Sequence, residues 1–190
     1  MSKGRLEAFS DGGLAIIITI MVLELRPPQG AGLSLLHPVV PSLLSYLLSF
    51  VFLGIYWNNH HHLFQAVQKV NGAILWANLH LLFWLSLVPF ATAWMGQSGF
   101  VLGPVAVFCF LQLMAAIAYY FLVRALLAHH GKGSTLAKAI GDDRKGKVSL
   151  VVYVVALVLT FFEPFLSLGL LVLVAVMWII PDRRIEKVLS

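Results

Sequence analysis

Charged residues are scarce in this sequence. Asp, Glu, Lys and Arg make up 11% of its 190 residues, whereas 60% are hydrophobic and the mean hydropathy is +0.91. A soluble domain carries roughly a quarter charged residues and about half apolar ones. The scarcity of charge therefore excludes an ordinary soluble domain and predicts an all-α membrane protein in a lipid bilayer.

Cysteine and metal-ligand patterns are also missing. Cys109 is the single cysteine, which excludes an intrachain disulfide, and the apolar run VFCFLQL around it favours a small buried side chain. His60, His61 and His62 are consecutive, but neighbouring helical residues point about 100° apart and cannot converge on one ion. No nucleophile-and-base spacing is visible. We therefore expect no metal site, no cofactor and no enzymatic activity.

Six hydrophobic runs follow one another along the chain. The last stretch divides at Glu163-Pro164, because a proline removes a helix donor and disfavours a helical conformation in the residue before it. Pro89 predicts a kink inside the third run. The chain is expected to form one domain over residues 1–190, with helices at about 5–25, 41–62, 72–95, 101–125, 147–162 and 164–181.

Basic residues gather on one side of this layout. Twelve of the thirteen Lys and Arg residues fall at the two termini or in and beside the loops 63–71 and 126–146, and only Arg26 falls on the other side. Cytoplasmic loops carry the excess of positive charge. Both termini are therefore predicted to be cytoplasmic, 126–146 to be a flexible cytoplasmic linker, and the protein to be a multi-pass protein of the cell membrane. Basic residues scattered over such loops argue against a nucleic-acid partner.

The first predicted helix has a short uncharged part. Twelve uncharged residues separate Asp11 from Glu24, and they cover about 18 Å as a helix, against a hydrocarbon core about 30 Å thick. No internal repeat is visible, so any symmetry must come from separate chains. Protein or water must shelter the ends of this helix.

One narrow apolar face runs along the same helix. At about 100° per residue and with Ile16 at zero, Leu23 lies at about −20°, Phe9 at about 20° and Ile20 at about 40°. Thr19 borders this face at about −60°. Taken alone, such a stripe is typical of ordinary helix packing as well as of a pore wall.

Asp11 lies behind this face, at about −140°, and Ser10 lies at about 120°. An unpaired buried carboxylate is costly, so Asp11 needs a donor. Arg5, about 120° away on the same helix, is a poor partner within one chain. We expect Phe9, Ser10 and Asp11 to fix this helix to its neighbours, with one histidine bonded to Asp11. The candidate partners on the second and third helices are Trp57, Asn59, His60, His61, Trp76, Asn78 and His80.

A carrier is the alternative to a channel. In that hypothesis the protein is a proton-coupled secondary transporter, with Asp11 and the membrane histidines as a proton relay. The inverted repeats and paired broken helices that are typical of such carriers are not apparent in the sequence.

The stretch RLEAFSD at 5–11, followed by GGLAIIITIMVLEL, resembles the Arg-x-x-x-Phe-Ser-Asp signature on the first helix of the transmembrane protein 175 family, the lysosomal and bacterial potassium channels. The stretches GIYWNNHHHLF at 54–64 and WANLHLLFWLSLVPFATAW at 76–94 are similar to the second and third helices of that family. The six-span layout is similar as well.

This resemblance implies a homotetramer whose first helices line a central pore for K⁺ and other monovalent cations. It places an isoleucine constriction at Ile16, further hydrophobic rings at Ile20 and Leu23, and a hydroxyl bordering the pore at Thr19. The TVGYG loop of ordinary potassium channels occurs neither in the family nor here. Because an apolar ring offers no oxygen to replace water around the ion, we expect only weak selectivity for potassium over sodium.

Overall fold

The computed structural model describes residues 2–131, 133–141 and 143–179, and the regular structure in this part of the chain is helical. The sequence predicts this all-helical architecture. The elements in chain order are α1 (Lys3–Leu23), the 3₁₀ helix η1 (Leu33–Val39), α2 (Val40–Gln65), α3 (Gly72–Ser86), α4 (Val88–Gln97), α5 (Leu102–His130), α6 (Thr135–Ile140), α7 (Arg144–Leu159) and α8 (Pro164–Ile179).

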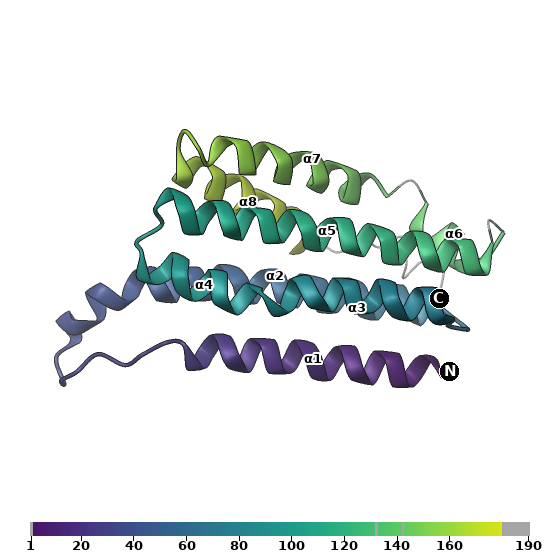
Figure 1. Cartoon of the computed structure of the whole chain (residues 1–190), viewed down its shortest axis with the longest axis horizontal. Helices are drawn as coiled ribbons and strands as arrows, with labels where there is room; N and C mark the ends of the chain where they lie inside the picture. Colours follow the sequence, from purple (N-terminus) through teal and green to yellow (C-terminus); the bar gives the residue numbers. More distant parts are fainter. Residues whose placement is uncertain (1, 132, 142, 180–190) are drawn as a thin grey trace.

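The long helices lie side by side, roughly along the long axis of the molecule (Figure 1). α1, drawn in purple, forms one edge and packs on α2, α3 and α4. α5 packs on α3 and on α7, and α7 and α8 form a hairpin at the opposite edge. α1 therefore has neighbours on one side only within this chain.

The third predicted run is interrupted, and this confirms the kink predicted at Pro89. α3 ends at Ser86, and α4 begins at Val88 with Pro89 in its first turn. The missing N–H of a proline leaves no bond unmade in the first turn of a helix, whereas inside a helix it removes one. The run therefore becomes two helices separated by Leu87.

Several helix ends differ from the sequence-based expectation. α5 continues to His130, beyond the predicted end at 125, because Leu126 is fully buried. The helix ends where Gly131, directly after it, has a positive φ angle of 83°. The short α6, which buries Leu136 against the core, lies within 126–146. The expectation of a wholly flexible linker there is wrong. The predicted end of the last helix at 181 lies outside the described residues.

Four helical stretches in the described part of the chain are long and apolar enough to cross a membrane. They are Lys3–Leu23, Leu33–Gln65, Gly72–Gln97 and Leu102–His130, and Pro164–Ile179 is a shorter apolar helix. The stretch Gly72–Gln97 combines α3 and α4. These stretches are those of a membrane protein.

Candidate pore-lining face of the first helix

α1 has a covered face and an open face. The covered face holds Ser10 and Ile17, which are 0% and 5% exposed, and it packs on the neighbouring helices. On the open face, Ile16 and Phe9 are each 62% exposed, and Leu23 is 74% exposed. Ile20 is also exposed. The open face is therefore the stripe that the helical periodicity defines, and the packing of this chain leaves it uncovered.

One flank of the open face consists of small residues. Gly4, Ala8, Gly12 and Ala15 are all exposed, and on a helical wheel with Ile16 at zero they lie between about −40° and −120°. A Cβ atom added at Gly4 or Gly12 would contact nothing within 4 Å. Small side chains let two helix backbones approach closely in a membrane. We call these four residues the small-residue flank.

Thr19 borders the open face. Its hydroxyl is exposed and donates a 2.9 Å hydrogen bond to the carbonyl oxygen of Ala15, one turn earlier. This bond occupies the hydroxyl proton and leaves the oxygen lone pairs facing away from the backbone. Thr19 thus supplies an oxygen acceptor beside an otherwise hydrophobic stripe.

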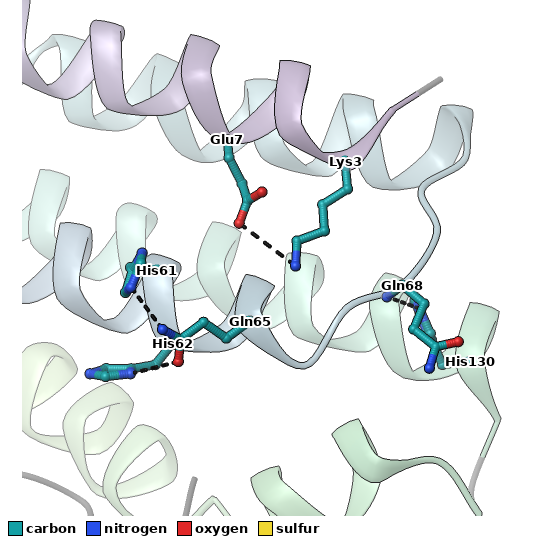
Figure 2. Close-up of polar contacts among 7 residues, drawn as sticks. All are labelled: Lys3, Glu7, His61, His62, Gln65, Gln68 and His130. Carbon is teal, nitrogen blue, oxygen red and sulfur yellow. Dashed lines mark hydrogen bonds and ion pairs between the residues drawn. The ribbon is translucent and has the colours of Figure 1, made fainter. Parts of the chain in front are cut away.

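Two charged residues near the start of α1 pair with each other. Lys3 Nζ lies 4.0 Å from Glu7 Oε1, one helical turn away, at the end of the bundle that holds the α2–α3 loop (Figure 2). Arg5 is exposed, and within the described residues no ion pair joins it to Asp11 or to another carboxylate. Arg5 therefore remains available to groups outside this chain.

Asp11 is held by an indole. Trp57 Nε1, on α2, donates a hydrogen bond to Asp11 Oδ1 at 3.1 Å. The prediction that a histidine bonds to Asp11 is therefore wrong. The physical reason is register: Trp57 lies level with Asp11, whereas His60 points around α2 toward α3, and His61 stacks on the Trp57 ring with centroids 6.0 Å apart.

Ser10 begins a buried chain of hydrogen bonds that joins three helices. Its hydroxyl donates to the carbonyl oxygen of Leu6 at 2.9 Å and accepts from Asn78 Nδ2, on α3, at 2.9 Å. Asn78 Oδ1 accepts a 2.8 Å bond from His60 Nε2, on α2. Since an amide oxygen only accepts, His60 carries a proton on Nε2. These paired polar groups fix α1, α2 and α3 relative to one another.

The other two consecutive histidines share a glutamine. Gln65 Nε2 donates to His61 Nε2 at 2.9 Å, and Gln65 Oε1 lies 3.4 Å from His62 Nδ1 (Figure 2). His60, by contrast, bonds to Asn78. His60 therefore has a different partner from His61 and His62, which contact the two ends of one amide.

The remaining candidate partners of the signature lie elsewhere. His80 Nε2 accepts from Trp84 Nε1 at 2.9 Å, and the His80 ring stacks on Phe121 of α5. The backbone oxygen of Asn59 accepts from the Tyr119 hydroxyl at 3.1 Å. Trp76 is 75% exposed. Trp57 and Asn78 thus contact the signature residues Asp11 and Ser10 directly, and His60 reaches Ser10 through Asn78. Asn59 and His80 contact residues of α5 instead.

Sequence reasoning missed a second polar cluster, at the α2–α3 loop. The backbone N–H of Gln68 donates to His130 Nε2 at 3.3 Å (Figure 2), and Asn71 Nδ2 donates to His129 Nδ1 at 3.2 Å. We call these two bonds the loop clasp. The only signal in the sequence is a pair of histidines directly before Gly131 at the end of an apolar helix. That signal does not reveal which loop they meet.

The described residues form an all-helical membrane protein. Its long apolar helices are joined by the buried hydrogen bonds of Ser10, Asn78 and His60. Residues 5–89 match the family model described as endosomal/lysosomal potassium channel TMEM175. A protein from Chryseobacterium sp. (strain P1-3), named a potassium channel, is 55% identical over 190 residues, with 100% of this chain and 99% of the relative covered. The chain therefore belongs to the TMEM175 family.

Two more distant relatives extend this comparison. The crystal structure of a lysosomal potassium-selective channel TMEM175 homolog from Chamaesiphon minutus superimposes with a TM-score of 0.77 at 30% sequence identity, covering 93% of this chain and 96% of that chain. A human protein named endosomal/lysosomal proton channel TMEM175 is 29% identical over 148 residues, which are 70% of this chain and 29% of the human protein. The first similarity covers nearly the whole fold described above.

Proposed function

We propose that this chain is one subunit of a homotetrameric cation channel that passes potassium, with the open face of α1 lining a central pore in the cell membrane. The relative from Chryseobacterium is named a potassium channel, and the one from Chamaesiphon minutus a potassium-selective channel homolog. The observation that carries the proposal for this chain is the exposure of Ile16, Ile20 and Leu23 along one edge of the protomer.

Lipid chains are an unfavourable environment for the exposed side of α1. Asp11 and Arg5 are exposed on the same helix, and a charge facing the hydrocarbon core costs about 2.5–3.5 kcal/mol or more. An assembly of subunits around a shared axis avoids this cost. The charged ends of α1 then meet water or protein, and its short apolar stripe faces the same stripe of the other subunits. The open face therefore fits a water-filled axis better than a bilayer.

The small-residue flank supports assembly through α1. Gly4, Ala8, Gly12 and Ala15 present almost no side chain beside the open face, so another helix can approach closely there. Four subunits is the number that the family resemblance implies, and the absence of an internal repeat requires that every wall of the pore come from a separate chain.

Six spans with both termini in the cytoplasm complete the proposed topology. α7 has 16 residues, and α8 has 16 within the described part of the chain. Sixteen residues give about 24 Å of helix, so α7 crosses only with local thinning or with polar ends at the interface. The distribution of Lys and Arg supports the orientation.

Selectivity in the proposed pore follows from the cost of removing water from the ion. Rings of Ile16, Ile20 and Leu23 offer no oxygen, so a narrow ring blocks conduction by dewetting, and a wider one favours the ion that loses water more easily. Potassium is hydrated more weakly than sodium. The Thr19 oxygen is a polar group beside the rings, and the apolar rings themselves make selectivity for potassium modest.

Flux in liposomes tests the proposal. Purified protein is reconstituted, a potassium gradient is imposed without added protons, and Ile16→Asn is compared with the unmodified chain. We expect potassium flux in both, with weaker discrimination against sodium in Ile16→Asn. Val151→Asn is the matched control, because Val151 is an apolar residue of α7 with 64% exposure. Equal selectivity of all three proteins contradicts a pore wall at Ile16.

The same liposomes test the alternative, a proton-coupled transporter that uses Asp11 and the membrane histidines. This alternative is tested because the human relative is named a proton channel. Strict dependence of potassium movement on a proton gradient favours the carrier. Potassium flux that persists when the proton gradient is removed excludes it.

A further inference from the structure

A hollow lies beside the open face of α1, at the end of the bundle where α1 and α4 end (Figure 1). Its volume is about 590 Å³. Ile20 and Glu24 line it from α1 and the residue after it, and Phe90, Trp94 and Gln97 line it from α4. We call this space the α1–α4 hollow. Phe90 is 62% exposed, so the packing of this chain leaves aromatic surface uncovered there.

The hollow is continuous with the face through which the subunits are proposed to meet. Ile20 belongs to the open face of α1 and also lines the hollow. α1 packs on α3 and α4 beside it, so one side of the hollow is closed by this chain itself. The other side is open toward the neighbouring subunit of a ring.

Glu24 brings a negative charge to this hollow without a cation to balance it. It is the C-cap residue of α1, where the last backbone carbonyl groups already give a negative potential. Its side chain is exposed, and among the residues that the structure describes no ion pair includes it. A positive group beside Glu24 would therefore be stabilising.

Arg26 is the complementary charge at the same end of the protomer. It lies two residues beyond Glu24 and is exposed. Within the described part of the chain it too takes part in no ion pair, so it does not pair with Glu24 of its own chain. Two opposite charges that stay apart within one chain fit a pair between two chains.

Cyclic symmetry determines which part of a second subunit can reach the hollow. A rotation about an axis along α1 keeps every residue at its height, and in a ring one flank of each α1 meets the opposite flank of the next. With Ile16 at zero, Ile20 and Glu24 lie at about 40° and 80°, whereas Val22 lies at about −120°. Val22 is 44% exposed. It therefore has the height and the side that face the hollow of the next subunit.

We propose that the end of α1 in one subunit fills the α1–α4 hollow of the next, with Val22 against Phe90 and Trp94 and with Arg26 paired to Glu24. This inference rests on the cyclic assembly of the proposed function and names the residues in contact. The aromatic wall takes the valine side chain, and the Glu24 edge takes the guanidinium. Each pair also neutralises one Glu24 carboxylate at the mouth of the proposed pore.

Disulfide trapping tests this contact without any flux measurement. A Val22→Cys chain with one affinity tag is co-expressed with a Phe90→Cys chain that has another, and the purified complex is oxidised mildly in detergent. Cys109 is fully buried, so the introduced thiols are the ones that react. We expect a dimer that carries both tags and is separated by reductant, because a disulfide needs Cβ atoms about 3.5–4.5 Å apart.

Trp94→Cys in place of Phe90→Cys tests the same wall one turn further along α4. Val151→Cys is the matched control, because Val151 is an exposed residue of α7, away from the hollow. Val22→Cys with Val151→Cys should give no dimer with both tags.

Charge reversal tests the ion pair independently. Glu24→Arg and Arg26→Glu each place like charges at the contact, and each should raise the protein concentration for half-maximal assembly about tenfold at low salt. The double variant restores opposite charges and should assemble as the unmodified chain does. Glu163→Arg is the control, because Glu163 is an exposed carboxylate between α7 and α8. Light scattering measures the assembly of all four variants.

The outcomes separate this inference from the channel proposal. If neither Phe90→Cys nor Trp94→Cys forms a dimer with Val22→Cys while light scattering still shows an oligomer, the contact at the α1–α4 hollow is overturned and the channel proposal stands. A double reversal that assembles no better than the single ones overturns the pairing of Arg26 with Glu24. An unmodified chain that is monomeric in detergent and in liposomes overturns both proposals.

Discussion

Asn78 Nδ2 donates a 2.9 Å hydrogen bond to Ser10 Oγ, and both side chains are almost completely buried. Because Asn78 Oδ1 also accepts from His60, one amide on α3 holds α1 and α2 together. Replacing Asn78 by Leu leaves the buried His60 Nε2 without its partner and removes one of the two hydrogen bonds of Ser10. We expect a loss of about 1–3 kcal/mol in the free energy of unfolding.

Chemical unfolding in detergent, followed by circular dichroism, measures this loss. Asn58→Leu is the control, because Asn58 is an exposed asparagine on α2, two residues before His60. We expect Asn78→Leu to reduce assembly of the subunits more than it changes ion selectivity. Equal stability of the two variants argues against a structural role for the Ser10–Asn78–His60 chain.

The Trp57 indole supplies the bond to Asp11, and Phe in its place keeps an aromatic ring without the N–H. We expect Trp57→Phe to lower the free energy of unfolding by about 0.5–1.5 kcal/mol, because the exposed Asp11 carboxylate loses the hydrogen bond from the indole. Trp76→Phe, at an exposed position of α3, should be nearly neutral. A melting temperature of Trp57→Phe equal to that of Trp76→Phe contradicts the assigned bond.

Helices α2 and α4 approach each other closely at Gly96. A Cβ atom added there would lie 2.6 Å from Ser42 Cα, and backbone atoms cannot move aside as a flexible side chain does. We expect Gly96→Ala to cost about 1–3 kcal/mol through overpacking. Gly169→Ala, on exposed α8 with nothing within 4 Å of its added Cβ, should instead stabilise its helix by up to about 1 kcal/mol. Thermal unfolding measures both, and a harmless Gly96→Ala contradicts the close approach.

The loop clasp depends on a histidine nitrogen acting as the acceptor in each of its two bonds. His130 Nδ1 lies 2.9 Å from the carbonyl oxygen of Leu126 and must donate to it, so His130 Nε2 has to be unprotonated to accept from Gln68. Asn71 Oδ1 accepts from the backbone N–H of Ile74, so its Nδ2 must donate to an unprotonated His129 Nδ1. Removal of either imidazole therefore removes an acceptor.

Loss of the imidazole at position 130 should leave the backbone N–H of Gln68 without its partner. Hydrogen exchange at Gln68 in His130→Leu should show a protection free energy about 1 kcal/mol lower than in the unmodified chain. His61→Leu, at an exposed histidine of α2, is the control. Protection that is unchanged in His130→Leu contradicts the clasp.

Much of the helical layout was predictable because long apolar runs and prolines control it locally. Pro89 and Pro164 each remove a backbone donor, and the structure has helix boundaries beside both. The end of α5 was not predictable in the same way, because Leu126 and the residues after it stay helical through tertiary packing. The short α6 likewise depends on the burial of Leu136.

In the candidate site, too, features set by one helix were predictable and features set by packing between helices were not. Periodicity alone separates the face of Ile16 from the side of Ser10, because both lie on one continuous helix. The partner of Asp11 depends on the axial register of α1 against α2. The Trp57 indole, and not the expected histidine, bonds to Asp11. The loop clasp joins residues about 60 positions apart and leaves no local pattern.

Thiol modification at position 16 tests the central claim most directly. Cys109 is the single native cysteine and is fully buried, so an introduced cysteine is the accessible thiol. A positively charged methanethiosulfonate reagent is added to liposomes that contain Ile16→Cys or the exposed control Val151→Cys, and potassium flux is recorded. The pore assignment predicts that most flux is lost in Ile16→Cys and retained in Val151→Cys. Flux that persists in Ile16→Cys after mass spectrometry has verified complete modification would contradict it.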